Sequence, residues 1–254
     1  MAAILRVEDI TVRYGALIAL QNLSWSVLPG EILGIIGPNG AGKSSCFAAV
    51  TNSVPHTGKV CLQGEDVSAL STDILALRGL RRTFQQNSFF GELSVLQNAV
   101  AAILAEHSTG LTASIVMPWR EARTRQRAES TAGTLLESFG IGAEYHGRRP
   151  TEIPYGIQRL LSVVLAYGLG TQAVLLDEPA AGMGGEDMKH LAQLLLDIKA
   201  RGAAVVLIEH HMDLIMNVAD RIIVIDQGRF LAEGTPTAIQ QNASVLDAYL
   251  GHAA

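Results

Sequence analysis

The sequence is poor in cysteine and has no long uninterrupted apolar segment. Its 254 residues include two cysteines, Cys46 and Cys61, which are too few for a disulfide framework and lack the spacing of metal ligands. We expect both to be buried thiols in a reducing compartment. Apolar residues make up 48% of the chain, but no run of them approaches the about 20 residues that a membrane-spanning helix needs. The first residues also lack the basic and apolar segments of a secretory signal.

The sequence also lacks an excess of basic residues. Its formal net charge is −5, which counts against a nucleic-acid partner, because proteins that bind nucleic acids carry a basic surface. Several arginines between Arg120 and Arg127 are interleaved with glutamates. That pattern predicts a solvated helix face rather than a binding patch.

The most informative feature that is present is a glycine-rich segment. Residues 37–44, GPNGAGKS, match the phosphate-binding pattern G-x-x-x-x-G-K-[S/T] at every fixed position. The apolar residues 31–36 before it predict a buried strand, and residues 45–50 after it predict a helix. A strand, loop and helix in this order direct backbone N–H groups and the positive end of the helix dipole toward a phosphate. The segment predicts a nucleoside triphosphate site formed by Gly37, Pro38, Asn39, Gly40, Ala41, Gly42, Lys43, Ser44 and Ser45.

Two residues of this segment have specific expected roles. The Lys43 ammonium would reach the β- and γ-phosphates, and the Ser44 hydroxyl would bind Mg²⁺. Two carboxylates, Asp177 and Glu178, follow the apolar run 173–176 farther along the chain. Neighbouring side chains on a strand point in different directions, so the two carboxylates can have different roles. We expect Asp177 to hold Mg²⁺ through its water shell and Glu178 to polarise the attacking water.

The order of the predicted elements indicates an α/β fold. Strands are expected near the N-terminus, at 5–12, 20–28 and 59–62, and helical spacing dominates from Ser94 to about Leu169. The last third alternates strand and helix, with strands at 173–176, 203–208 and 221–225, which predicts a parallel sheet. We therefore expect one domain over 1–254. Its nucleotide-binding core would comprise 1–85 and 170–254, with a parallel sheet and a layer of antiparallel strands, and residues 86–169 would form a helical subdomain.

With these motifs, the chain resembles the ATPase subunits of ATP-binding-cassette (ABC) transporters over nearly its whole length. The resemblance implies that Tyr14 stacks on the adenine ring. It implies that Gln85 contacts the metal and senses the γ-phosphate, and that His210 donates a hydrogen bond to that phosphate. The expected catalytic residues are therefore Glu178, His210 and Gln85, with Ser44, Gln85 and Asp177 at the metal. ATP and Mg²⁺ are the implied cofactors.

The chain departs from the family where the family has its Leu-Ser-Gly-Gly-Gln signature. The aligned residues are Ile153-Pro154-Tyr155-Gly156-Ile157, so Pro154 replaces a serine that meets the nucleotide of the opposite subunit. Proline supplies neither a hydroxyl nor an N–H group, whereas Gly156 and the following helix are retained. One interpretation is a heterodimer with a strong and a weak hydrolytic site. The other is that Pro154 is tolerated and a homodimer is active.

Within the family, the chain resembles the ATPase subunits of branched-chain amino acid importers. The resemblance includes the segments Arg82–Gln85, Tyr155–Gly156 and Glu209–Met212. That subgroup implies transmembrane permease subunits as partners, with Phe89, Phe90 and Leu93 as candidate contacts. It also implies an indirect solute-binding partner and a peripheral position on the cytoplasmic face of the inner membrane. Lipopolysaccharide-export ATPases share many of these features. An ABC ATPase outside transport and an ATP-binding regulator are the remaining alternatives.

Overall fold

The computed structural model describes residues 2–83, 89–106 and 118–251, and the chain divides into two compact units. The first unit comprises Met1–Gln85, Thr171–Ala181 and Leu195–Ala254. The second comprises Gln86–Gly170 and Gly182–Leu194. The long helix α8, Gly185–Ala200, contributes residues to both units.

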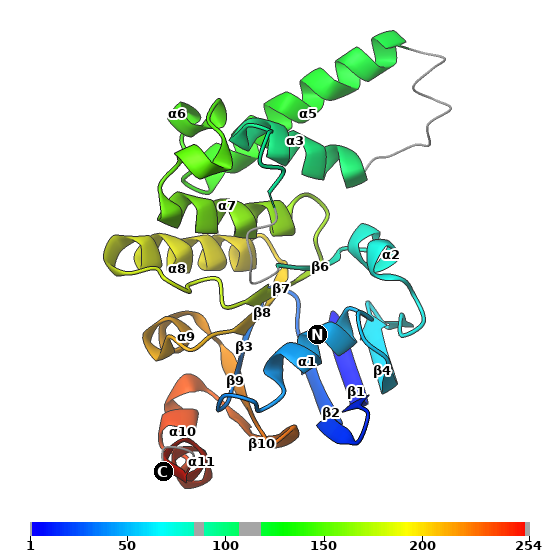
Figure 1. Cartoon of the computed structure of the whole chain (residues 1–254), viewed down its shortest axis with the longest axis vertical. Helices are drawn as coiled ribbons and strands as arrows, with labels where there is room; N and C mark the ends of the chain where they lie inside the picture. Colours follow the sequence, from blue (N-terminus) through cyan, green and yellow to red (C-terminus); the bar gives the residue numbers. More distant parts are fainter. Residues whose placement is uncertain (1, 84–88, 107–117, 252–254) are drawn as a thin grey trace. The chain divides into compact units, whose positions relative to one another are not determined.

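A six-stranded sheet forms the centre of the first unit (Figure 1). Its order is β10-β9-β3-β8-β7-β6, and every neighbouring pair is parallel except β10 with β9. The strands are β3 Ile32–Ile36, β6 Leu80–Arg82, β7 Ala173–Asp177, β8 Ala204–Ile208, β9 Arg221–Asp226 and β10 Arg229–Gly234. Every residue of β3, β7 and β8 is buried, as expected for apolar strands inside a parallel sheet. The parallel sheet predicted from the sequence is confirmed.

A second, antiparallel sheet in the same unit has the order β2-β1-β4-β5. It contains β1 Leu5–Tyr14, β2 Leu17–Val27, β4 His56–Leu62 and β5 Glu65–Asp66. The prediction ended the first strand two residues too early. Tyr14 pairs with Leu17 across a two-residue turn, and this short connection lets both strands continue to the turn.

Helix α1, Lys43–Val50, follows β3 and packs in the core of the first unit. Its Phe47 and Cys46 are fully buried together with Leu33 of β3 and Val7 of β1. The helix begins at Lys43, two residues before the predicted start. The other helices of this unit are α2 Thr72–Leu77, α9 Met212–Val218, α10 Pro236–Gln240 and α11 Ala243–Gly251.

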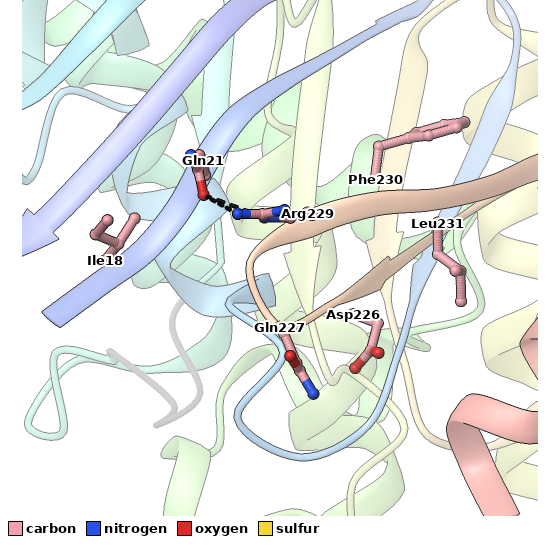
Figure 2. A pocket seen from close by; sticks show the side chains of 7 residues that line it. All are labelled: Ile18, Gln21, Asp226, Gln227, Arg229, Phe230 and Leu231. Carbon is pink, nitrogen blue, oxygen red and sulfur yellow. Dashed lines mark hydrogen bonds between the residues drawn. The ribbon is translucent and has the colours of Figure 1, made fainter. Parts of the chain in front are cut away.

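The hairpin between β9 and β10 connects the phosphate-binding segment to β2. The Gly228 N–H donates to the Ala41 carbonyl (3.0 Å), and the Gly228 carbonyl accepts from the Gln21 N–H (2.8 Å). Arg229 also donates to the Gln21 side chain at 2.7 Å (Figure 2). An open pocket of about 490 Å³ lies beside this contact. Its lining residues are Ile18, Gln21, Asp226, Gln227, Arg229, Phe230 and Leu231, none of which is a predicted site residue.

In its described residues the second unit consists of helices and turns, as predicted for this part of the chain (Figure 1). It contains α3 Val95–Glu106, α5 Pro118–Ser138, α6 Ala143–His146, the 3-10 turn Pro150–Glu152, α7 Tyr155–Tyr167 and the first part of α8. Buried apolar residues such as Ala132, Leu136 and Leu161 form its core. Phe139 packs edge-on against Tyr167, with 5.6 Å between ring centroids. Across the described ranges of both units, no helix combines the length and apolar character needed to cross a membrane.

Candidate functional site

The loop between β3 and α1 has the geometry of an anion site. Gly42 precedes the helix with φ 98°, and a Cβ at this position would lie 2.5 Å from the Ala19 carbonyl oxygen, so only glycine fits. Gly42 has no side chain to cap α1, and the first turn of the helix contains no acidic residue. The first N–H groups of α1 and the positive end of its dipole are therefore suited to an anion.

Lys43 is held inside this loop. Its ammonium donates to the carbonyl oxygens of Gly37 (2.7 Å) and Pro38 (2.9 Å), and the residue is only 7% exposed. Burial lowers the pKa of Lys43, while the nearby carboxylates of Glu178 and Asp177 act in the opposite direction. The structure thus brings Lys43 near Asp177 and Glu178, which lie about 130 positions later in the sequence and were predicted to belong to the same site.

Asp177 ends β7 with its side chain 1% exposed. Its Oδ2 accepts from Arg82 Nη2 at 2.9 Å, and its N–H donates to the Thr83 hydroxyl at 3.1 Å. Burial raises the pKa of this carboxyl, and the adjacent Arg82 guanidinium opposes that shift. Oδ1 of Asp177 is buried and makes no hydrogen bond within the described part of the chain. A buried oxygen without a partner suits a hydrated cation.

These residues fit Mg²⁺. The Ser44 side chain is exposed in the first turn of α1 and offers the hydroxyl expected at the metal. Among the described residues, no three His, Cys, Asp or Glu side chains gather into a metal site. Mg²⁺ keeps several waters and binds through one or two protein oxygens plus substrate phosphates, so a site of this kind does not require such a cluster.

Glu178 follows β7 directly and contacts His210. Glu178 Oε1 lies 2.7 Å from His210 Nε2, with the two side chains 28% and 44% exposed. The backbone of Glu178 is in the left-handed region at φ 50°, and its N–H donates to the Ile208 carbonyl at 2.9 Å. A left-handed non-glycine residue is strained, and such strain is concentrated at functional sites. The two predicted catalytic residues, 32 positions apart in the sequence, therefore form one pair.

Two other residues were predicted for the nucleotide site, Tyr14 and Gln85, and the structure describes only the first of them. Tyr14 lies at the end of β1 and is 47% exposed, so its side chain is accessible to a stacking partner. Gln85 lies outside the residues that the structure describes, and its predicted role stays a prediction.

The signature-like segment lies in the second unit. Pro154 precedes α7 with an extended backbone, and its carbonyl accepts from the Gln158 N–H at 3.0 Å. Gly156, in the first turn of α7, is covered by the Asp187 carboxylate, whose nearest atom would lie 2.3 Å from a Cβ added there. Tyr155 is 44% exposed and packs near Gly182. The expected helix is present but begins at Tyr155 rather than at the predicted Arg159, and Pro154 leaves its start without a capping side chain.

The sequence interpretation missed three residues near the site: Arg82, Thr83 and Glu209. Arg82 and Thr83 belong to β6 and the residue after it, and this strand is too short to be recognised by periodicity. Glu209 directly follows the buried run of β8 and is 2% exposed. A carboxylate at the end of a buried strand was a usable signal, because the same signal identified Asp177 and Glu178.

Comparisons with known proteins identify the relatives of this chain. The ABC transporter family model matches residues 20–181, and the model described as branched-chain amino acid ATP-binding cassette transporter matches residues 231–254. The high-affinity branched-chain amino acid transport ATP-binding protein LivG of Escherichia coli (strain K12) is 35% identical over 252 residues, which cover 98% of both chains. The lipopolysaccharide export ATP-binding protein LptB of the same strain is 28% identical over 250 residues, again 98% of both chains.

The fold is also that of a solved ABC cassette. The ADP conformation of MJ1267, an ATP-binding cassette of an ABC transporter, matches with a TM-score of 0.84 and 26% sequence identity, covering 99% of this chain and 100% of that one. The expected fold class is thereby confirmed. The chain belongs to the ABC transporter family and is one of its ATP-binding ATPase subunits.

Proposed function

We propose that this chain hydrolyses ATP with Glu178 as the residue that polarises the attacking water. The observation that carries the proposal is the 2.7 Å contact between Glu178 and His210, in the same unit as the phosphate loop with its buried Lys43. His210 would hold the Glu178 carboxylate before ATP binds and would donate to the γ-phosphate afterwards. Gln85 would contact the γ-phosphate and the metal from the segment after β6.

The remaining roles follow from the loop and its surroundings. Lys43 would exchange its two carbonyl partners for phosphate oxygens, which are stronger acceptors because they are charged. The exposed Tyr14 ring would stack on adenine. Mg²⁺ would be held by the Ser44 hydroxyl and by Asp177 through water, and when bound it neutralises charge that develops on the phosphates.

We propose that the two units together form one ABC ATPase domain, with residues 86–169 as its helical subdomain. The domain would act peripherally at the cytoplasmic face of the inner membrane by binding permease subunits. An exposed aromatic supports such a contact: Phe90 is 66% exposed. Its backbone is fixed by the buried Asn98, which accepts from the Phe90 N–H (2.9 Å) and donates to the Phe90 carbonyl (3.2 Å).

The transported solute is proposed from the relatives. LivG is a branched-chain amino acid transport ATP-binding protein, and the family matched at the C-terminal end is also one of branched-chain amino acid transporters. We propose import of branched-chain amino acids, with a solute-binding protein delivering them to the permease. Lipopolysaccharide export is the second candidate, supported by the lower identity to LptB.

The test is uptake of radiolabelled leucine by cells that lack this chain and are complemented with the wild type or with Glu178→Gln. We expect uptake with the wild type and none with the variant, because solute movement depends on hydrolysis. Equal uptake in all cells would contradict amino-acid import. In that case, a surface lipopolysaccharide defect in the deletion strain would favour the second candidate.

We further propose that two cassettes assemble asymmetrically. Pro154 supplies no hydroxyl to the nucleotide of a partner subunit, so the site containing this residue would be weak. The site built on Lys43 and Glu178 would use the partner's signature and be strong. A heterodimer accommodates this asymmetry, whereas a homodimer would have two weakened sites.

A further inference from the structure

Glu209 is a buried carboxylate to which the proposed mechanism gives no role. It lies between the end of β8 and His210, and its side chain is 1% exposed. Burying an ionised carboxylate costs free energy unless hydrogen-bond donors surround it. The donors around Glu209 therefore show what it holds in place.

The two oxygens of Glu209 bind different segments. Oε1 accepts from the Ala180 N–H at 2.6 Å. Oε2 accepts from the His210 N–H at 3.1 Å, lies 3.1 Å from His211 Nδ1, and has a longer 3.4 Å contact with the His211 N–H. One carboxylate thus connects the turn after β7 with the turn after β8.

Those two segments carry the proposed hydrolytic pair. Ala180 comes two residues after Glu178, and His210 comes directly after Glu209. Ala180 and His210 lie beyond the ends of β7 and β8, and buried N–H groups need acceptors. The Glu209 carboxylate has two acceptor oxygens, so it serves both segments at once, and its charge shortens and strengthens the bonds.

We propose that Glu209 is a positioning residue for ATP hydrolysis, which fixes the turn carrying Glu178 against the segment carrying His210. The role rests on the function proposed above for Glu178. Glu209 itself does not touch the nucleotide. It acts by limiting the relative movement of two side chains that must lie 2.7 Å apart, because a small misplacement of reacting groups slows chemistry greatly.

The test compares Glu209→Gln with a matched control, Glu31→Gln. Glu31 is also buried, at 8% exposure, and accepts from a backbone N–H (Leu28, 2.6 Å) and from a cationic side chain (Arg221, 2.8 Å). It precedes β3, at the end of the sheet opposite to the phosphate loop. Both amides keep the shape of the carboxylate and lose one acceptor oxygen.

ATP hydrolysis is measured in the assembled transporter, and ATP affinity and thermal unfolding are measured on each purified variant. We expect Glu209→Gln to lower kcat at least about tenfold while the Kd for ATP stays within about twofold. Glu31→Gln should lower the melting temperature and leave kcat unchanged. Glu209→Asp, which retains both oxygens on a shorter stem, should recover part of the rate.

A double-variant cycle separates positioning from general damage. In a His210→Ala background, Glu209→Gln should lower kcat by a much smaller factor than in the wild type. The pair that Glu209 positions is already broken there. An unchanged kcat in Glu209→Gln, or full additivity with His210→Ala, would overturn the proposal. If the wild-type rate does not depend on Glu178, the proposed function fails. If it does, and Glu209→Gln matches the wild type, only the positioning role fails.

Discussion

At the scale of single residues, polar side chains at the ends of buried strands determine the chemistry. Asp177 ends β7 and Glu178 follows it, while Glu209 and His210 follow β8, so four polar residues lie at one edge of the sheet. Backbone strain at Glu178 (φ 50°) accompanies this arrangement. The sequence motifs name three of these residues, while the contact partners of each come only from the fold.

A residue-scale prediction concerns Cys46, which follows the phosphate loop within α1. The thiol is fully buried, and burial raises its pKa to about 12. Because only the thiolate reacts and a raised pKa keeps the thiol protonated, we expect no alkylation of Cys46 by iodoacetamide in the native protein at pH 8. Both cysteines should be labelled in urea. Mass spectrometry of the digested protein locates the label, and rapid native labelling of Cys46 would contradict the assigned burial.

At the scale of elements, the hairpin between β9 and β10 determines how the phosphate loop is supported. Gly228 has φ 74°, and a Cβ there would lie 2.5 Å from the Ala19 carbonyl oxygen. Its backbone bonds to both Ala41 and Gln21. The hairpin therefore requires glycine for its conformation and for the space available.

Gly228→Ala should lower the free energy of unfolding by about 2–3 kcal/mol, since it adds a backbone clash to the strain of a positive φ. Gly64→Ala is the matched control, because Gly64 has φ 84° but nothing within 4 Å of an added Cβ. Gly64→Ala should lower the free energy of unfolding by about 1 kcal/mol. Urea denaturation measures both. If the two variants lost equal free energy of unfolding, the close approach of Gly228 to β2 would not explain the effect of Gly228→Ala.

Asn98 gives a second element-scale prediction. Its side chain bonds the backbone of Phe90 and also donates to the carbonyls of Leu93 (3.2 Å) and Ser94 (3.0 Å). Asn98→Ala should destabilise the protein by about 2 kcal/mol, because it leaves several partly buried backbone groups without partners. It should also weaken co-purification with the permease while leaving the Kd for ATP unchanged. Phe90→Ala should reproduce the loss of permease binding without the loss of stability.

The sequence predicts the elements with strong periodicity and misses those that depend on distant partners. Strands β3, β7 and β8 are short apolar runs, and their burial follows from composition. Strand β6 has only three residues and exists because it pairs with β7, which no local pattern records. Arg82 at its end was missed for the same reason, although its guanidinium binds Asp177.

At the scale of the whole molecule, the hydrolytic residues and the signature-like segment belong to different units of the chain. Lys43, Asp177, Glu178 and His210 lie in the first unit, and Pro154 lies in the second. Substitutions in the two units should therefore affect different steps if two cassettes exchange their signature segments. A substitution of Pro154 tests whether the two units act on different nucleotides.

Pro154→Ser should raise ATP hydrolysis by the heterodimer, because serine restores a hydroxyl at the start of α7 and can cap the helix. The gain should depend on the catalytic glutamate of the partner cassette rather than on Glu178 of this chain. Phosphate release by pairs that carry Pro154→Ser with or without Glu178→Gln measures this dependence. A gain that Glu178→Gln abolishes would contradict the proposed asymmetry.

The most direct test of the account is steady-state ATP hydrolysis by this chain alone and together with its neighbouring cassette subunit, each compared with Glu178→Gln. We expect little hydrolysis by the chain alone and strong hydrolysis by the pair, which falls by at least about 10²-fold in the variant. Robust Glu178-dependent turnover by the chain alone would contradict the asymmetric assembly. Glu178 would not be the residue that drives ATP hydrolysis if neither the chain alone nor the pair hydrolysed ATP. The same conclusion would follow if Glu178→Gln left the rate of the pair unchanged.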